Sequence, residues 1–128
     1  KGFEAEINYP FIIGNKEQQL KFSYTFIKDD LEAVDVNFSK YSINSLKYHF
    51  ASTFVSNISS NIQCFVALKY ADRPSIGRYT LLDLNLQWDW KSFQFNASAN
   101  NLLDTQYSET SLVPMPGRNA LLSVQYNF

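Results

Sequence analysis

Apolar and polar residues alternate along most of this chain with a period of two. The clearest run covers residues 82–90, where every second residue is apolar and those between are polar. Its apolar positions are Leu82, Leu84, Leu86, Trp88 and Trp90, and its polar positions are Asp83, Asn85, Gln87 and Asp89. Successive side chains of a β-strand point to opposite faces. The pattern therefore predicts a strand with one apolar and one polar face.

Six further stretches follow the same rule, so we expect an all-β chain of about seven strands with no helix. They are residues 3–9, 20–26, 46–54, 62–70, 93–99 and 118–128. Only Lys91 and Ser92 separate two of the apolar runs, which predicts a tight hairpin. The four prolines, Pro10, Pro74, Pro114 and Pro116, fall outside the stretches. This is expected if each strand donates all its backbone hydrogen bonds.

The predicted connections differ in length. Residues 56–61 and 91–92 form short ones, whereas residues 28–44, 71–78 and 101–117 form longer ones. The connection at residues 10–19 is longer than expected for its side. Tight turns at one end and larger loops at the other are typical of antiparallel up-and-down barrels of the bacterial outer membrane. We therefore predict such an arrangement, with Phe128 at the short-turn end.

The last eleven residues, 118–128, read as a membrane strand that ends on an aromatic residue. Ala120, Leu122, Val124, Tyr126 and Phe128 share one face, and Leu121 is the only apolar residue on the other. Chain termini usually fray in polar residues, whereas a barrel must pair its final strand and leave no edge. The ending therefore favours a strand of a transmembrane barrel.

Aromatic residues make up 16% of the chain, and the pattern sorts them by depth. On the apolar face, one group is expected near the short turns, namely Tyr9, Phe54, Trp88, Trp90, Phe93 and Phe128. A second group, Phe3, Phe26 and Tyr70, is expected near the longer loops. Aromatic girdles at both interfaces are typical of membrane barrels.

The charged and reactive residues exclude several classes of function. Lysine and arginine number 11 against 12 acidic residues, so there is no basic surface for nucleic acid. The single cysteine, Cys64, cannot form an internal disulfide and is too little for a thiolate metal site. His49 has no cysteine or histidine at ligand spacing. Without a nucleophile beside a base or a phosphate-binding loop, we expect no enzyme, no metal and no cofactor.

Three features stand out in the final third of the chain. Residues 101–107 follow the pattern N-L-x-D-x-x-Y, residues 114–118 follow P-x-P-G-R, and the last residue is Phe128. Together they give this part of the chain a resemblance to the carboxyl end of TonB-dependent outer-membrane receptors. It extends over about 50 residues, from the run at residues 83–90 to the end. Residues 1–77 agree in strand rhythm but carry no comparable motif.

This resemblance implies the last third of a 22-stranded barrel that imports a scarce nutrient, such as a siderophore–iron complex or cobalamin, by coupling to TonB. Residues 1–128 would then be the carboxyl-terminal portion of the barrel, without the plug domain and the TonB box. The implied partners are the remaining barrel and its plug, outer-membrane lipid, TonB and the barrel-assembly machinery. An aromatic-ended strand can add to a sheet edge. The assembly signal would comprise Leu122, Val124, Tyr126 and Phe128.

Three further sets of residues have expected roles. The junction between the last loop and the last strand comprises Pro114, Pro116, Gly117 and Arg118, with Arg118 paired to a carboxylate such as Asp104. Ligand contacts are expected from residues 29–42 and 103–115, with candidates Tyr41, Tyr107 and Met115. The lumen would be lined by Glu4, Glu6, Lys21, Lys47, His49, Lys69, Asp83 and Asp89.

Two other interpretations stay open. A small self-contained outer-membrane barrel with a structural or adhesive role needs an even number of strands, commonly eight. An eighth strand within residues 31–44, where Val34, Val36 and Phe38 alternate, would supply it. A soluble β-barrel binding module would instead turn the apolar residues inward around a ligand. Alternation alone does not distinguish inside from outside.

Overall fold

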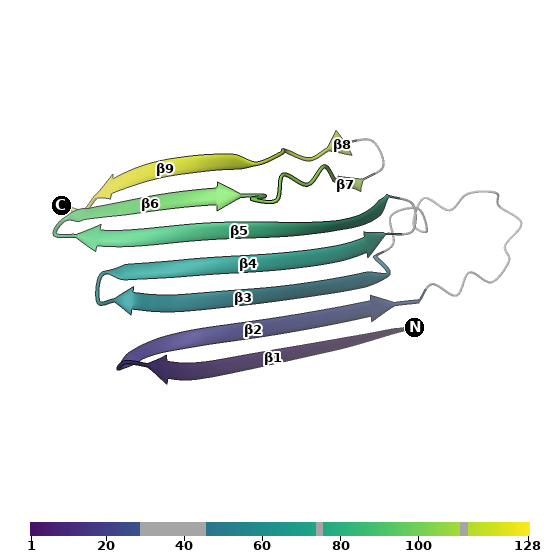
Figure 1. The fold of residues 1–128 in the computed structure, drawn as a ribbon, viewed down its shortest axis with the longest axis horizontal. Coiled ribbons are helices and arrows are strands. Elements are labelled where there is room, and N and C mark those ends of the chain that lie inside the picture. Colours follow the sequence, from purple (N-terminus) through teal and green to yellow (C-terminus); the bar gives the residue numbers. More distant parts are fainter. Residues whose placement is uncertain (29–45, 74–75, 111–112) are drawn as a thin grey trace, which may run out of the picture.

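Seven antiparallel strands form one continuous sheet in the computed structural model, which describes residues 1–28, 46–73, 76–110 and 113–128. The strand order is β1-β2-β3-β4-β5-β6-β9, so each strand pairs with its neighbour in the sequence, apart from a small excursion before the last (Figure 1). The strands are β1 (Gly2–Ile13), β2 (Lys16–Ile27), β3 (Tyr48–Ser59), β4 (Ile62–Arg73), β5 (Gly77–Trp90), β6 (Phe93–Asn100) and β9 (Asn119–Tyr126). A separate two-stranded sheet joins β7 (Ser108–Thr110) to β8 (Val113–Pro114).

The turns at the short-turn end are tighter than the sequence predicted. β1 and β2 meet at Gly14 and Asn15, both with positive φ, and β3 and β4 meet at Ser60 and Asn61. The hairpin at Lys91 and Ser92 is confirmed. The long connection expected at residues 10–19 was wrong, and the short connection expected at residues 56–61 is present but limited to Ser60 and Asn61. In both places the strands continue further than their strict alternation does.

The expectation that all four prolines lie outside strands was also wrong, since two of them lie inside strands. Pro10 is in β1 opposite Gln19, and Pro114 is in β8. β1 is an edge strand of the described sheet, where a missing N–H disturbs no internal ladder. Pro116 lies outside the strands, and Pro74 is outside the described residues.

Connections at the opposite end are uneven. Those between β2 and β3 and between β6 and β9 are long, whereas β4 and β5 are separated only by residues 74–76. The long connection expected at residues 71–78 was therefore wrong. The difference in connection length between the two ends of the sheet therefore comes from the β2–β3 and β6–β9 connections alone.

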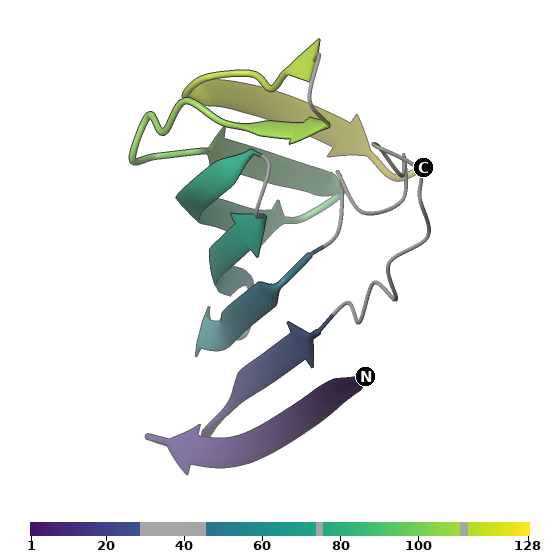
Figure 2. The same ribbon diagram turned by 90° about the vertical axis from the view of Figure 1, so that its right-hand side faces the viewer.

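The sheet curves but is not closed (Figure 2). β1 and β9 lie at opposite edges, and within the described residues neither outer edge has a partner strand. β2 pairs directly with β3, from Gln18 opposite Ser56 to Phe26 opposite Tyr48. No further strand lies between these two in the sheet. The eighth strand considered for residues 31–44 falls outside the described residues.

Candidate functional site

The register of the strands places most of the apolar residues of all seven on one face. Residues directly opposite each other in a sheet share a face, and one row across the sheet is apolar at every position. This row is Tyr9, Leu20, Phe54, Val66, Leu84, Ala99 and Ala120. We call this side of the sheet, which also carries Leu82, Leu86, Trp88 and Leu122, the apolar face.

No layer of protein covers the apolar face in the part of the chain that the structure describes. Among the described residues, 22 large hydrophobic residues are exposed, most of them on this face, whereas only Ala71, Tyr79 and Leu81 are buried apolar residues. Those three lie on the other side of the sheet. A soluble domain buries its apolar sheet face against another layer. In the described residues this sheet has no such second layer.

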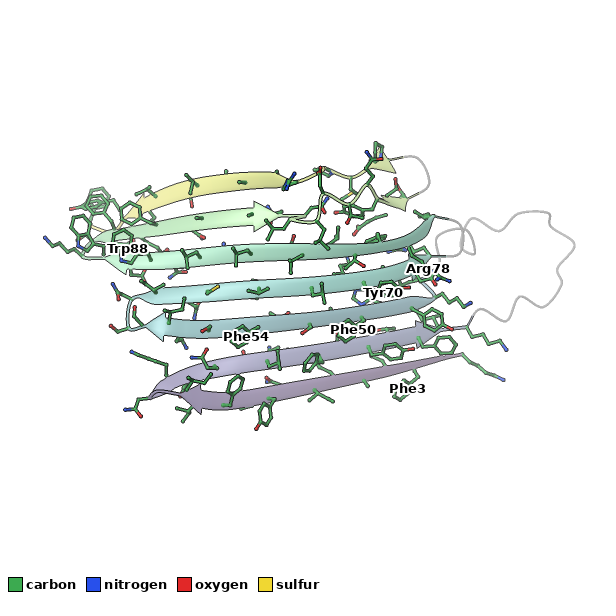
Figure 3. All side chains as sticks on the ribbon, viewed as in Figure 1. Phe3, Phe50, Phe54, Tyr70, Arg78 and Trp88 are labelled. Carbon is green, nitrogen blue, oxygen red and sulfur yellow. The ribbon has the colours of Figure 1, made fainter. Side chains whose placement is uncertain are left out.

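Charged residues occur on the apolar face only near its two ends, among the described strands. Arg78 and Asp72 are directly opposite each other near the long-loop end and form an ion pair of 3.1 Å. Lys16 follows the turn at the other end. Between these limits β5 presents apolar side chains from Leu82 to Trp90. Figure 3 shows Trp88 and Arg78 at opposite ends of the sheet.

Aromatic rings form a continuous cluster at the short-turn end. Trp88 stacks on Trp90 and on Phe95, with ring centroids 6.2 and 5.1 Å apart. Phe93 joins this group to Tyr126, which meets Phe128 edge to face at 5.0 Å. The structure thus brings together four members of the expected short-turn group, Trp88, Trp90, Phe93 and Phe128. Phe54 instead lies in the middle of β3, because that strand extends to Ser59.

The other side of the sheet, the polar face, carries seven of the eight side chains expected to line the lumen. The exception is Lys47, which precedes β3 and places its ammonium 5.3 Å from the ring of Tyr48. Amide and carboxylate side chains bond across the strands there. Asn85 donates to Asn96 at 2.7 Å, Gln94 donates to Asp89 at 2.9 Å, and Gln63 donates to Asn57 at 3.0 Å. These contacts satisfy polar groups without a second layer of protein.

Residues 101–109, which we call the strap, cross part of the polar face. The hydroxyl of Thr105 donates to the carbonyl oxygen of Thr80 at 2.7 Å. The ring of Tyr107 packs on that of Tyr79 with centroids 4.7 Å apart. Further along, Glu109 forms an ion pair of 3.1 Å with Lys69. Tyr107 of the strap packs against the small core of Ala71, Tyr79 and Leu81, and so does Leu46, which precedes β3.

The strap has a second side, which lines a hollow of about 560 Å³ at the long-loop end. Thr105, Tyr107 and Glu109 bind the sheet, whereas the residues between them, Gln106 and Ser108, line the hollow. The other lining residues are Ile76, Asp104, Tyr107, Pro114, Met115 and Gly117. Of the candidate ligand residues, Tyr107 and Met115 are therefore brought together, and the N–H of Met115 donates to the carbonyl oxygen of Tyr107 at 2.9 Å. Tyr41 is outside the described residues.

Two side chains that sequence reasoning treated lightly fix the base of this loop. The carboxamide of Asn101, which is buried, accepts from the N–H of Thr105 and donates to the carbonyl oxygens of Thr105 and Pro116. The expected pairing of Arg118 with Asp104 is present at 3.9 Å. Both Asn101 and Asp104 have positive φ. Asn and Asp are the residues besides glycine that most readily adopt this conformation, which is the one sequence signal that points to them.

The residues expected to form the assembly signal lie on the edge strand β9 and on the residues that follow it. The N–H of Asn127 donates to the carbonyl oxygen of Ser92 at 2.8 Å. Hydrogen-bonded pairs recur at every second residue, so odd-numbered residues of β9 bond to β6. Leu122, Val124 and Tyr126 therefore present their backbone groups at the outer edge. Their side chains, like that of Phe128, are exposed.

Among the described residues, no three side chains of His, Cys, Asp or Glu lie together as a metal site would require. No helix of the described part is long and apolar enough to span a membrane.

Comparison with known proteins gives no relative. No family model, no curated protein and no solved structure matches this chain.

Proposed function

We propose that this chain forms part of the wall of an outer-membrane β-barrel, with its apolar face in contact with lipid and its polar face toward the lumen. The observation that carries the proposal is the apolar face itself, which spans all seven strands, is exposed, and in the described strands has its charges only near its ends. Lipid is the covering that such a face requires if no protein layer supplies it.

Strand length supports the same proposal. β1 to β4 each have 12 residues and β5 has 14. Crossing the hydrocarbon core takes about 9–11 residues at the usual tilt, whereas strands of globular proteins have about 5–6. Strands of this length in a single open layer are unusual for a soluble module, because they enlarge an apolar surface that nothing buries.

Strand parity favours a larger barrel over a self-contained one. β1 and β9 run in the same direction, since six antiparallel steps separate them in the sheet. Joining them directly would create a parallel pair, and single-chain bacterial barrels have even strand numbers. An odd number of further strands would complete an antiparallel wall.

We further propose that the complete barrel is a TonB-coupled receptor for a siderophore–iron complex, cobalamin or a comparable nutrient. The support is the resemblance of residues 101–107 and 114–118 to that family, together with the hollow formed by these two segments at the long-loop end. A hollow of about 560 Å³ is within the size range of small-molecule sites. The strap would place Gln106 and Ser108, and residues 113–117 would place Met115, where an outer ligand first meets the protein.

Extraction and intact mass test the two parts of this proposal. We expect the native polypeptide to stay in the membrane fraction after carbonate washing, to need detergent for solubility, and to have a mass of several hundred residues. Solubility without detergent would refute the membrane wall and favour the soluble module. A detergent-dependent protein with a mass near that of 128 residues would refute the receptor and favour a small barrel.

A further inference from the structure

The outer edge of β1 has a defined hydrogen-bonding pattern. The nitrogen of Lys1 donates to the carbonyl oxygen of Lys28 at 2.9 Å, and the N–H of Lys28 donates back to Lys1 at 2.7 Å. Such reciprocal pairs recur at every second residue of an antiparallel ladder. Odd-numbered residues of β1 therefore bond to β2. The even-numbered residues Gly2, Glu4, Glu6 and Asn8 direct their N–H and carbonyl groups outward.

Pro10 interrupts this outward row. It is the next even-numbered residue of β1, and it has no N–H to donate. Four successive outward donors thus lie between Gly2 and Asn8, followed by a position that cannot donate. Ile12 resumes the series beyond the proline. A partner strand would therefore find a regular ladder over Gly2–Asn8 and lose it at Pro10.

Charge gives the outer edge a second requirement. Glu4 and Glu6 lie on the polar face, opposite Thr25 and Ser23 of β2, neither of which is cationic. Neither carboxylate has an ion-pair partner among the described residues. Opposite charges directly across a strand pair are stabilising. The side of β1 that lacks a neighbour is where a cation could meet both carboxylates.

The apolar side of the same edge is also incomplete. Phe3, Ile7 and Tyr9 are 61%, 62% and 61% exposed, although each has an apolar partner in β2. A neighbouring strand with apolar residues in the same rows would cover their free flanks. β9 of a second copy does not fit this position, because in the same membrane orientation it would run parallel to β1.

We propose that β1 pairs over Gly2–Asn8 with an antiparallel strand of the same polypeptide, that this strand carries lysine or arginine opposite Glu4 and Glu6, and that the ladder ends at Pro10. The inference rests on the proposed barrel and specifies one of its interfaces. It assigns Glu4, Glu6 and Pro10 to the recognition of that strand.

Photo-cross-linking in the full-length protein, in its membrane, tests the pairing directly. Benzoylphenylalanine placed at Asn8 should give an adduct within one polypeptide, and the cross-linked peptide should carry basic residues at alternate positions. The same group at Ile12, beyond the proline, is the matched control and should give several-fold less adduct. Adducts between two copies, equal adducts at both positions, or a partner peptide without basic residues would overturn the proposal.

Charge substitution tests the second element separately. The double variant Glu4→Lys, Glu6→Lys should lower the fraction of protein that stays folded in SDS before heating, and Glu4→Gln, Glu6→Gln should lower it less. Lys21→Gln, on the polar face of the interior strand β2, controls for loss of charge alone. No difference between the lysine and glutamine variants would refute the cationic partner. Solubility without detergent would refute the proposed barrel, whichever result these variants give.

Discussion

Asp104 accepts a hydrogen bond of 2.9 Å from the backbone N–H of Arg118, which lies 14 residues further along the chain. A Cβ at Gly117 would come within 3.2 Å of the same carboxylate, so the glycine permits this approach. One carboxylate thus joins the end of β6 to the start of β9. The motif residues that suggested a receptor have, in this structure, a physical role in setting where the last strand begins.

Removing this contact should loosen the start of β9. Asp104→Ala leaves the N–H of Arg118 without its partner, and we expect the free energy of unfolding to fall by about 1 kcal/mol. Asp104→Asn keeps an acceptor oxygen and should lose less. Urea unfolding of the protein refolded in detergent micelles measures both variants. Equal stability of wild type and Asp104→Ala would show that the ladder between β6 and β9 is sufficient.

The strap should depend on its ion pair only modestly. The side chains of Lys69 and Glu109 are 36% and 40% exposed, and exposed pairs contribute about 0.2–1 kcal/mol. A double-mutant cycle with Lys69→Ala and Glu109→Gln should give a coupling in that range, and both single variants should increase protease cleavage within residues 101–109. A coupling of zero with unchanged cleavage would leave Tyr107 and Thr105 as the anchors.

The strap should also weaken in alkali. Burial, and secondly the carboxylate of Glu109, raise the pKa of Tyr107 above its ordinary value of 10.0. The folded protein therefore holds the phenol proton more tightly than the unfolded chain. Its contribution to stability is fully present below pH 10 and is lost as pH rises through the raised pKa. Between pH 9 and pH 11, the urea midpoint of unfolding should fall more for wild type than for Tyr107→Phe. An equal fall of the midpoint in both proteins would contradict this.

Side-chain alternation predicted the strands themselves well. It did not predict where each strand ends, because backbone pairing can continue beyond the alternating residues. Residues 82–90 lie in β5 as expected, since every side chain there matches its face. Pro10 was placed outside a strand because a missing N–H breaks an internal ladder, but the backbone nitrogen of Pro10 faces away from β2 and breaks no hydrogen bond of the described sheet. Local pattern does not show which strand will be an edge.

The strap and its hollow could not be predicted for a different reason. Tyr107 meets Tyr79, and Glu109 meets Lys69 across 40 residues of sequence, so these contacts depend on the tertiary fold. The sequence identified Tyr107 and Met115 only as members of a loop. The hollow forms where the strap and Met115 come together in the folded chain. No periodic pattern in these short segments predicts that contact.

The aromatic cluster should lie at the level of the lipid headgroups. Trp88 and Trp90 stack at the short-turn end, and Lys91 places its ammonium 5.1 Å from the ring of Trp90. In liposomes, lipids brominated near the headgroup should quench tryptophan fluorescence more than lipids brominated at the chain ends. Trp88→Phe and Trp90→Phe separate the two indoles. Stronger quenching by lipids brominated at the chain ends, or no quenching, would show that the cluster does not lie at the headgroup level.

Substitution along β5 provides a test of depth that does not depend on ligand. Leu84 lies midway along the apolar side of this strand, whereas Thr80 lies close to the charged end marked by Arg78. In a bilayer, an arginine on the lipid-facing side costs about 2–4 kcal/mol at the midplane and about 0–1 near the interfaces. Leu84→Arg should therefore destabilise the liposome-inserted protein far more than Thr80→Arg. Asn85→Arg, one residue along on the polar face, controls for strand disruption and should cost less than Leu84→Arg, since it loses only the hydrogen bond to Asn96. Equal costs at Leu84 and Thr80 would mean that the apolar face does not cross a bilayer, because only a membrane makes the penalty depend on depth.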